Sequence, residues 1–352
     1  MKRVLSILIA LAMVISSLSV NAFAAGSDKN KLSEESKAVI LENYKEFIAE
    51  VDGDPSRIPM IVSTDQHGAI KANSDIYRYV DEIVDWSKIS KIINLGDTVE
   101  NKLNPFQLMA YRIATTCLPR DKRIEVIGNH DRFFVPFGTM VDMLFFPTPN
   151  AKRAIGRNAF VVKDEDFNVR YLAIDTKNFP YQYTDGALST TQANFIIKEL
   201  SKDDESDIVL LAHPYLFRDA VIRRNGSVFT GSDYFIGGPD KYTDVKQSFV
   251  DMLAARKNKT SGVLIDCRGV EHPYDFSNCK SDFLMTLHGH HHTEGYETKD
   301  GITEFMFQSF TLDNAANTEP NCFYFAYIDR DDKTFKCWKN LEGYDAWEIE
   351  IA

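Results

Sequence analysis

The chain has 352 residues, of which 44% are hydrophobic and 26% are charged, so it is a globular protein with one large domain or two ordinary ones. Its formal net charge is −11 at pH 7, which disfavours electrostatic binding to a nucleic-acid duplex. It contains no internal repeat and no low-complexity tract, which excludes a solenoid or a fibrous protein.

Residues 1–24 have the pattern of a secretory signal peptide. Lys2 and Arg3 precede an apolar run over 4–14, and small residues end in the cleavage pattern Ala22-Phe23-Ala24. The run is too short to span a bilayer, and no second long apolar run follows it. We therefore expect a secreted protein, extracellular or periplasmic, with no membrane span.

The first half of the mature chain alternates strands with helices. A polar segment over 25–57 carries a helix that should pack outside the core. Three short apolar runs predict strands, and apolar residues at helical spacing predict a helix between each pair. The strands are expected at 58–62, 89–95 and 123–127, and the helices at about 34–50, around 76–84 and over 104–117. This βαβαβ order predicts parallel strands covered by helices.

The second half is more varied. Two paired strands are expected first, and Ser189 with Gln192 forms a capping box that begins a helix reaching Leu200. The paired strands lie at 159–163 and 169–174, further strands at 207–212, near Val263 and at 283–287, and another helix over 245–256. After residue 304 we expect three or four antiparallel strands with a turn at 329–332.

Five cysteines in an exported chain allow two disulfide bonds and leave one thiol over. The pairs nearest in sequence are Cys267 with Cys279 and Cys322 with Cys337. Cys117 is expected to be a buried thiol in a helix. The spacing does not fix the connectivity, and in a bacterial export context all five could equally be reduced.

Five short blocks of potential metal ligands occur along the chain, each after an apolar run. They are Asp65-Gln66-His67, Gly96-Asp97, Gly128-Asn129-His130-Asp131, His213 before Pro214, and Gly289-His290-His291-His292. Asp65, Asp97 and Asn129 are 32 residues apart, about one βαβ unit each. One edge of a parallel sheet should therefore collect oxygen and nitrogen ligands for two divalent cations.

Each block alone has a simpler interpretation. Asp65-x-His67 and Gly96-Asp97 are typical of turns, His213 alone would be a core or loop histidine, and the three consecutive histidines could be a surface tract. The block at 128–131 is stronger, because four turn-forming or ionisable residues after an apolar strand have no packing purpose. Their joint occurrence decides the matter, since six of the eight histidines fall in these blocks. Because the blocks must meet at one point, residues 25–352 are interpreted as a single domain.

The combination resembles the calcineurin-like metallophosphoesterase family, whose pattern is D-x-H, G-D, G-N-H-D/E, a lone His and G-H-x-H. All five parts stand unbroken over roughly residues 58–310. The resemblance implies an α/β (α+β sandwich) fold. In that fold two mixed β-sheets pack face to face, helices lie on both outer faces, and the metal site lies at the carboxyl ends of strands. The strands after residue 304 would help to build the second sheet.

The resemblance also implies a centre of two divalent metal ions. One ion would be held by Asp65, His67, Asp97 and His292, and the other by Asp97, Asn129, His213 and His290, with Asp97 bridging. Imidazole and carboxylate ligands suit Zn, Fe or Mn, and a neutral amide oxygen can fill a position without adding charge.

The activity implied is hydrolysis of a small phosphomonoester or phosphodiester by a metal-bridging hydroxide that attacks phosphorus in line. His130 would stabilise the equatorial oxygens or protonate the leaving alkoxide, and Asp131 would orient His130 by a hydrogen bond. The alternative is a non-catalytic metal-binding or surface-binding protein on the same fold. Its usual sign, an eroded ligand set, is not seen here. The motif leaves the substrate, the metal and the oligomeric state open.

Several residues near the blocks depart from the family pattern. Val99 stands where purple acid phosphatases carry a metal-bound tyrosine, so a ferric-tyrosinate centre is not expected. Glu100 stands where relatives often have Asp or Asn, and we interpret it as a solvated loop carboxylate. His288 and His291 match no ligand position and are expected to lie beside the site, while His272 is expected to be structural.

The stretch at about 214–281 is a long insertion for this family. Its aromatic residues could form a lid that packs the leaving group, with Arg223 and Arg224 binding phosphate. It could equally be a surface excursion with a small cluster of its own. The aromatic residues are Tyr215, Phe217, Phe229, Tyr234 and Phe235.

Overall fold

The computed structural model describes residues 32–67, 70–99, 105–131, 148–154, 159–175, 188–214, 221–229, 243–310 and 322–352. All the predicted metal ligands, His130 and Asp131 lie inside these ranges. The predicted signal peptide, Glu100, four of the five aromatic residues of the insertion and the side chain of the fifth, Phe229, lie outside the described part.

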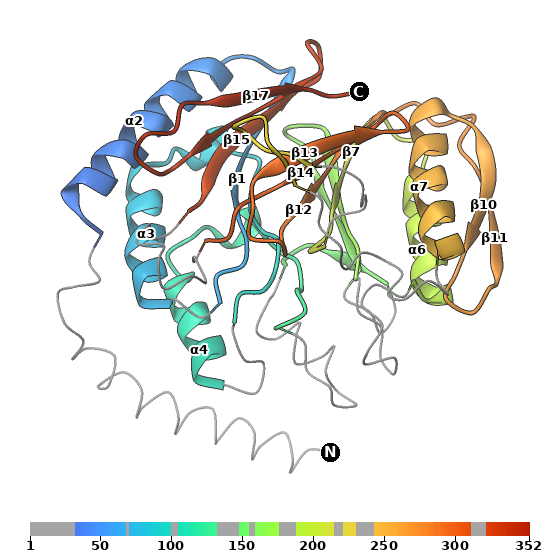
Figure 1. Cartoon of the computed structure of the whole chain (residues 1–352), viewed down its shortest axis with the longest axis horizontal. Coiled ribbons are helices and arrows are strands. Elements are labelled where there is room, and N and C mark those ends of the chain that lie inside the picture. Colours follow the sequence, from blue (N-terminus) through green and yellow to red (C-terminus); the bar gives the residue numbers. More distant parts are fainter. Residues whose placement is uncertain are drawn as a thin grey trace.

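Six strands form a mixed sheet around the first βαβαβ unit (Figure 1). Their order is β17 (Trp347–Glu350), β16 (Thr334–Lys339), β15 (Tyr324–Asp329), β1 (Arg57–Ser63), β2 (Lys91–Asn94) and β3 (Arg123–Glu125). The first three strands in the chain are parallel, as crossover helices α3 (Ile70–Ile83) and α4 (Pro105–Ala114) require. β15 pairs antiparallel with β1, and β16 and β17 continue the antiparallel order.

Nine strands form the second sheet. Their order is β4 (Lys152–Arg153), β5 (Phe160–Asp164), β6 (Val169–Ala173), β7 (Asp207–Leu211), β12 (Phe283–His288), β14 (Ile302–Met306), β13 (Gly295–Lys299), β8 (Val221–Ile222) and β9 (Val228–Phe229). The four central strands β6, β7, β12 and β14 are parallel. Antiparallel strands flank them on both sides.

The two sheets pack face to face because side chains alternate along their strands. Ile58 and Met60 of β1 share a buried cluster with Val209 of β7 and Met285 of β12. The intervening Ile61 points the other way, toward the helices on the outer face. The core between the sheets is therefore built from every second residue of each strand.

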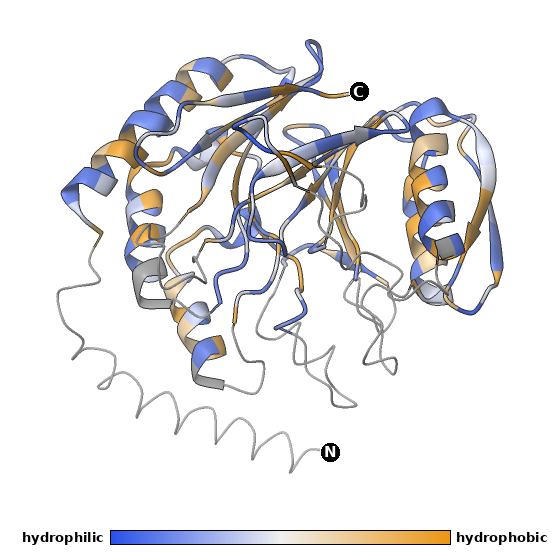
Figure 2. Ribbon diagram, viewed as in Figure 1, coloured by the Kyte–Doolittle hydropathy of each residue, from blue (hydrophilic) through white to orange (hydrophobic). Residues whose placement is uncertain are grey.

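Helices cover both outer faces (Figure 1). The helix α2 (Glu34–Val51) joins α3 and α4 on the six-stranded sheet, and α6 (Thr190–Leu200) and α7 (Thr243–Asn258) lie on the nine-stranded sheet. Figure 2 shows mainly hydrophobic central strands between helices of mixed hydropathy. The predicted α+β sandwich is confirmed. Within the described ranges, no helix combines the length and hydropathy needed to cross a bilayer.

The strands near the carboxyl terminus correct one expectation. They were expected to build the second sheet, but β15, β16 and β17 extend the sheet that contains β1. β1 has β2 on one side only, and β15 supplies the hydrogen-bond partners on its other edge. Among the strands described after residue 300, β14 alone joins the nine-stranded sheet, beside β12.

The insertion holds more structure than its sequence suggested. The expected strand near Val263 is β10 (Ser261–Ile265), and it pairs with β11 (Glu271–Asp275), which was missed. Pro273 lies inside β11, and a proline cannot donate a ladder hydrogen bond, so the segment did not resemble a strand. The hairpin is a separate two-stranded sheet beyond α7 (Figure 1).

Two further local expectations have mixed outcomes. The Ser189 side chain accepts a hydrogen bond from the Gln192 backbone at the start of α6, as in a capping box. The Gln192 side chain instead bonds to the backbone N–H and C=O of Asp175, so the reciprocal half of the box is absent. All five cysteines are free thiols, which agrees with the reduced alternative.

The docking of α2 gives the first prediction. Phe47 is fully buried, with its ring centroid 5.5 Å from that of Phe325 and 5.7 Å from that of Trp338. We expect Phe47→Ala to lower the free energy of unfolding by about 3–5 kcal/mol through lost burial and a cavity, measured by urea denaturation. Glu42→Ala on the exposed side of the same helix should change it by less than about 0.5 kcal/mol. Equal losses in the two variants would contradict this packing.

Candidate metal centre

The five ligand blocks meet at one edge of the sandwich. The segments after β1, β2 and β3 carry Asp65 with His67, Asp97, and Asn129 with His130. The segment after β7 carries His213, and the segment after β12 carries His290 and His292. The sequence predicted one edge of one sheet, but the ligands come from the carboxyl ends of strands in both sheets. Packing the sheets face to face brings those two edges together.

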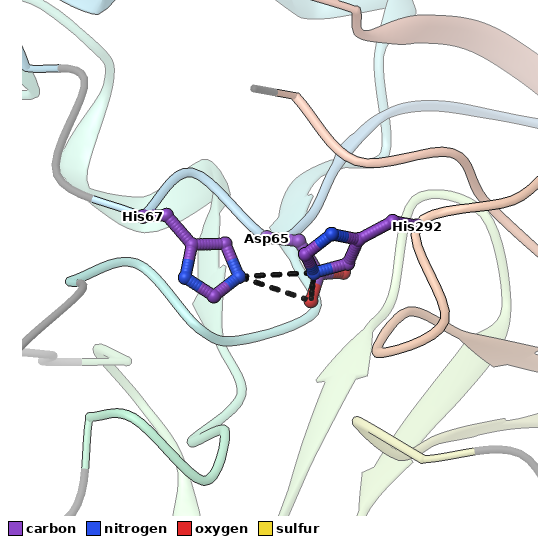
Figure 3. Close-up of side chains that lie close together, drawn as sticks. All are labelled: Asp65, His67 and His292. Carbon is purple, nitrogen blue, oxygen red and sulfur yellow. Dashed lines mark hydrogen bonds and ion pairs between the residues drawn. The ribbon is translucent and has the colours of Figure 1, made fainter. Parts of the chain in front are cut away.

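The first cluster contains Asp65, His67 and His292 (Figure 3). The Nε2 atoms of His67 and His292 are 3.0 Å apart. They lie 3.8 Å and 3.2 Å, respectively, from Oδ1 of Asp65. Figure 3 shows both rings directing a nitrogen toward this carboxylate. Two imidazoles and one carboxylate so arranged are a ligand set for a transition metal ion or zinc.

The second cluster contains Asp97, His213 and His290. Nε2 of His213 lies 3.0 Å from Oδ2 of Asp97 and 3.2 Å from Nδ1 of His290. The same Nε2 is 3.8 Å from Oδ1 of Asp65, so the two clusters adjoin. The predicted sharing of Asp97 between two ions stays a prediction, because the short contacts place Asp97 in the second cluster.

Asn129 supplies independent support for a ligand role. Its side-chain oxygen Oδ1 is buried and has no hydrogen-bond partner among the described residues. A buried amide oxygen without a partner costs free energy unless another group binds it. Asn129 is one of the predicted ligands, so a metal ion would satisfy the atom that the protein leaves unpaired.

The outer hydrogen bonds hold the ligands in place. Nδ1 of His213 donates to the backbone oxygen of Leu95 over 2.9 Å, which directs Nε2 toward the cluster. Oδ2 of Asp65 accepts from the hydroxyl of Thr64 (2.6 Å) and the backbone N–H of His290 (2.8 Å). The bond from His290 ties the loop after β1 to the loop after β12, so the two sheets hold the first cluster jointly.

The buried carboxylates of the two clusters favour positive charge next to them. Asp65 and Asp97 are almost completely buried. Burial by itself raises the pKa of Asp65, but His213, His292 and His67 together hold it well below the ordinary value. Burial lowers the pKa of His213, yet the carboxylates of Asp97 and Asp65 outweigh it and raise that pKa to about 9. Without metal, the protonated ring of His213 therefore supplies positive charge to both carboxylates. Bound cations would supply that charge instead.

The backbone is strained where the ligands lie. Asp65, His67, Asp97, His290 and His292 all have positive φ, between 44° and 76°. Residues other than glycine rarely adopt this conformation outside turns, and it costs about 1–3 kcal/mol per residue. The surrounding fold sustains this conformation at five candidate ligands.

The glycines of the blocks allow the loops to approach each other. A Cβ on Gly128 would lie 2.2 Å from Oδ1 of Asp97, and a Cβ on Gly289 would lie 1.9 Å from Oγ1 of Thr64. A Cβ on Gly96 would meet the backbone of Gly128 at 2.7 Å. The motif glycines are therefore required by the contacts between loops, and any side chain there would separate the ligands.

The two predicted catalytic residues lie beside the clusters. The His130 ring centroid is 4.8 Å from that of His67, and the His130 backbone N–H donates to Oδ1 of Asp97 over 2.7 Å. Asp131 was expected to orient His130. Its two carboxylate oxygens accept from the backbone N–H groups of Val99 and Gly128, each over 3.0 Å. Asp131 thus fastens the loop after β3 to the loop after β2.

Other residues near the site have distinct positions. His288 is the last residue of β12 and donates from Nδ1 to the oxygen of Pro214 over 2.8 Å. Burial lowers its pKa to about 3. The half-buried ring of His291 lies 4.9 Å from that of His290. His272 pairs with Asp266 at the β10–β11 hairpin, away from the ligand loops (Figure 1).

Sequence reasoning missed Ser309 and Thr64. The Ser309 hydroxyl donates to the backbone oxygen of Asp65 over 2.7 Å, and the Phe310 backbone N–H donates to Thr64. The segment after β14 therefore supports the loop after β1. Small hydroxyl residues after an apolar strand are common, so the sequence carried no signal for this contact.

The sequence matches no protein-family model and no curated protein. Solved structures with a similar arrangement include a predicted phosphoesterase from Streptococcus pneumoniae, 12% identical (83% of this chain, 97% of that one, TM-score 0.36). A purple acid phosphatase from yellow lupin seeds is 13% identical (84% and 54%, TM-score 0.47). A putative 5′-nucleotidase from Staphylococcus aureus is 12% identical (84% and 54%, TM-score 0.41). These TM-scores are below 0.5, so the functional proposal depends on the residues of this chain.

The glycine contacts give the second prediction. We expect Gly128→Ala to separate Asp97 from the loop after β3 and to weaken metal binding at least tenfold, measured by isothermal titration with Mn²⁺. Gly301→Ala is the matched control, because that glycine has φ of 75° and open space around it. It should cost about 1 kcal/mol of stability and leave metal affinity unchanged. Unchanged affinity in Gly128→Ala would show that the two loops do not need this close approach.

Proposed function

We propose that this protein is a secreted, metal-dependent phosphoester hydrolase with a dinuclear centre. One observation carries the proposal above all. Four loops from two sheets bring two groups of carboxylate and imidazole ligands together, and a fifth loop carries the buried, unpartnered oxygen of Asn129. A lone metal-scavenging histidine tract would not need ligands from both sheets. Two adjoining ligand sets are what two-metal phosphoester hydrolysis requires.

The donor atoms fit the expected ions. Asp65, His67 and His292 would hold one ion, and His213, His290 and Asn129 the other, with Asp97 shared. Mixed imidazole and oxygen ligands suit Mn, Zn or Fe, and no thiolate is among the donors. Two such ions, when bound, lower the pKa of water and neutralise the charge of phosphoryl oxygens.

His130 is the proposed catalytic residue. Its ring lies against that of His67, and its backbone N–H is fixed on Asp97. An imidazole beside the cluster can donate a hydrogen bond to an equatorial phosphoryl oxygen or a proton to the leaving alkoxide. Asp131 acts on His130 through the backbone, since its carboxylate holds the loop that carries both residues.

The substrate is proposed to be a small phosphomonoester or phosphodiester. Loops set the choice between these classes, because the ligand set acts only on the phosphoryl group. The net charge of −11 opposes a polynucleotide duplex as substrate. Residues 1–24 are proposed to direct export of the chain.

Metal removal gives the third prediction. Dialysis against EDTA should abolish hydrolysis of an aryl phosphate or an aryl phosphodiester, and added Mn²⁺ or Zn²⁺ should restore it. Colorimetric release of nitrophenolate measures the rate. Full activity after exhaustive chelation would contradict the metal requirement. Tight metal binding without hydrolysis of any ester would instead favour a metal-binding protein on the same fold.

A pair of variants gives the fourth prediction. Asp97→Ala should lose both metal and activity, because its carboxylate belongs to the cluster. His130→Ala should keep its metal and lose kcat by about 10²–10⁴-fold, the usual scale for a general acid. Elemental analysis and steady-state kinetics measure the two quantities. His272→Ala, a buried histidine at the distant hairpin, is the control and should keep both.

The leaving group then separates the two roles of His130. If His130 donates a proton, the loss of kcat should be smaller for nitrophenolate esters than for alkyl esters, since nitrophenolate needs little protonation. An equal loss for both would assign His130 to stabilising phosphoryl oxygens. A His130→Ala protein that is free of metal would show that His130 is itself a ligand.

A further inference from the structure

Arg224 of the insertion is held on three sides. It lies at the turn between β8 and β9. Its guanidinium donates two hydrogen bonds to the Glu294 carboxylate, from Nη2 to Oε1 over 2.7 Å and from Nε to Oε2 over 3.2 Å. Nη1 donates to the backbone oxygen of Asp345. The guanidinium carbon also lies 5.0 Å from the Trp347 ring centroid. Each nitrogen of the guanidinium thus already has a partner in the protein.

The partner carboxylate is two residues from a candidate metal ligand. Glu294 follows His292 after Thr293, and it is buried, with 7% of its surface exposed. The next residue, Gly295, packs directly on β8, since a Cβ there would lie 2.2 Å from Cγ1 of Val221. The insertion therefore holds the segment that leaves His292 both by an ion pair and by close packing.

The carboxyl-terminal strands complete this support. Tyr344 lies between two cations, with its ring centroid 3.8 Å from Nζ of Lys339 and 5.9 Å from the guanidinium of Arg224. Lys339 donates to the side chain of Gln308, which precedes Ser309. Ser309 bonds to the backbone of Asp65. Arg224, Tyr344 and Lys339 thus connect to two segments of the first metal-ligand group. One segment follows His292 and the other contains Asp65.

We propose that Arg224 is a positioning residue for the first metal-ligand group and not a phosphate ligand. This inference rests on the proposed dinuclear centre. Arg224 fixes Glu294 and, through it, the path of the chain from His292 into β13. Without that ion pair, a buried carboxylate two residues from His292 would lose its counter-charge and move toward water. His292 would then lose its fixed position beside His67 and Asp65.

The chain offers a matched control, Arg57, at the amino end of β1. Arg57 also pairs with a buried carboxylate, Nε to Oδ2 of Asp329 at 2.8 Å, and its guanidinium lies 4.9 Å from the Tyr327 ring centroid. The Arg57 and Arg224 side chains are about equally exposed, at 21% and 20%. Arg57 lies at the start of β1, whereas the ligands follow its end.

Mn²⁺ binding to the full chain without substrate tests the proposal. Arg224→Ala and Glu294→Gln should each weaken one of two binding steps about tenfold, because supports of metal ligands carry effects of at least this size. The double variant should show no further loss, since both changes remove one interaction. Arg57→Ala should bind both ions as the wild type does. Circular dichroism confirms that each variant is folded.

Inhibition by inorganic phosphate separates the two roles of Arg224. If Arg224 were a phosphate ligand, Glu294→Gln would free its guanidinium from the ion pair. Phosphate would then bind more tightly, and both Mn²⁺ affinities would stay unchanged. That result would overturn the proposal. A wild-type chain that binds two Mn²⁺ ions and hydrolyses no ester would remove the proposed reaction but leave this inference standing, provided that the variants weaken one step.

Discussion

Two carboxylates withdrawn from water at one point, Asp65 and Asp97, are the constraint on which this structure depends. Burying two negative charges together is unfavourable unless positive charge or fixed hydrogen-bond donors surround them. Here His213 lies within 3.8 Å of both, and backbone N–H groups of His290 and His130 donate to them. The remaining negative charge is what makes the cluster a candidate metal centre.

The loops around these carboxylates have an unusual backbone conformation and unusually close contacts. Five candidate ligands accept a left-handed backbone, and three glycines let neighbouring loops come closer than a Cβ would permit. Both features cost conformational free energy. The sandwich supplies the stability that holds them, because its core is formed by both sheets and both helical layers.

The two sheets contribute different kinds of ligand to the site. The six-stranded sheet contributes both carboxylates and the amide, and the nine-stranded sheet contributes three of the four clustered imidazoles. The site therefore exists only when the sheets are packed together. Arg224 supports this packing from outside the ligand loops, because it bonds both Glu294, next to β13, and the backbone of Asp345, before β17. Asp131 holds the loops after β2 and β3 of the six-stranded sheet together.

The sequence alone determined the order of the main strands and helices, and it named every residue that now lies in the two clusters. It could do so because both signals are local. Apolar periodicity reports which face of an element is buried, and ligand types placed directly after apolar runs report the ends of strands. The α+β sandwich followed from the resemblance that those blocks carry.

Only the tertiary structure decided which strands became neighbours. β15 joins β1 across more than two hundred residues, and β11, with its Pro273, forms a hairpin that periodicity did not show. The partners of Asp131 and Arg224 were likewise beyond the sequence, because a charged side chain takes whatever donor or carboxylate the packed fold places within reach. Pairing between distant segments depends on the whole fold, whereas strand ends are marked by adjacent residues.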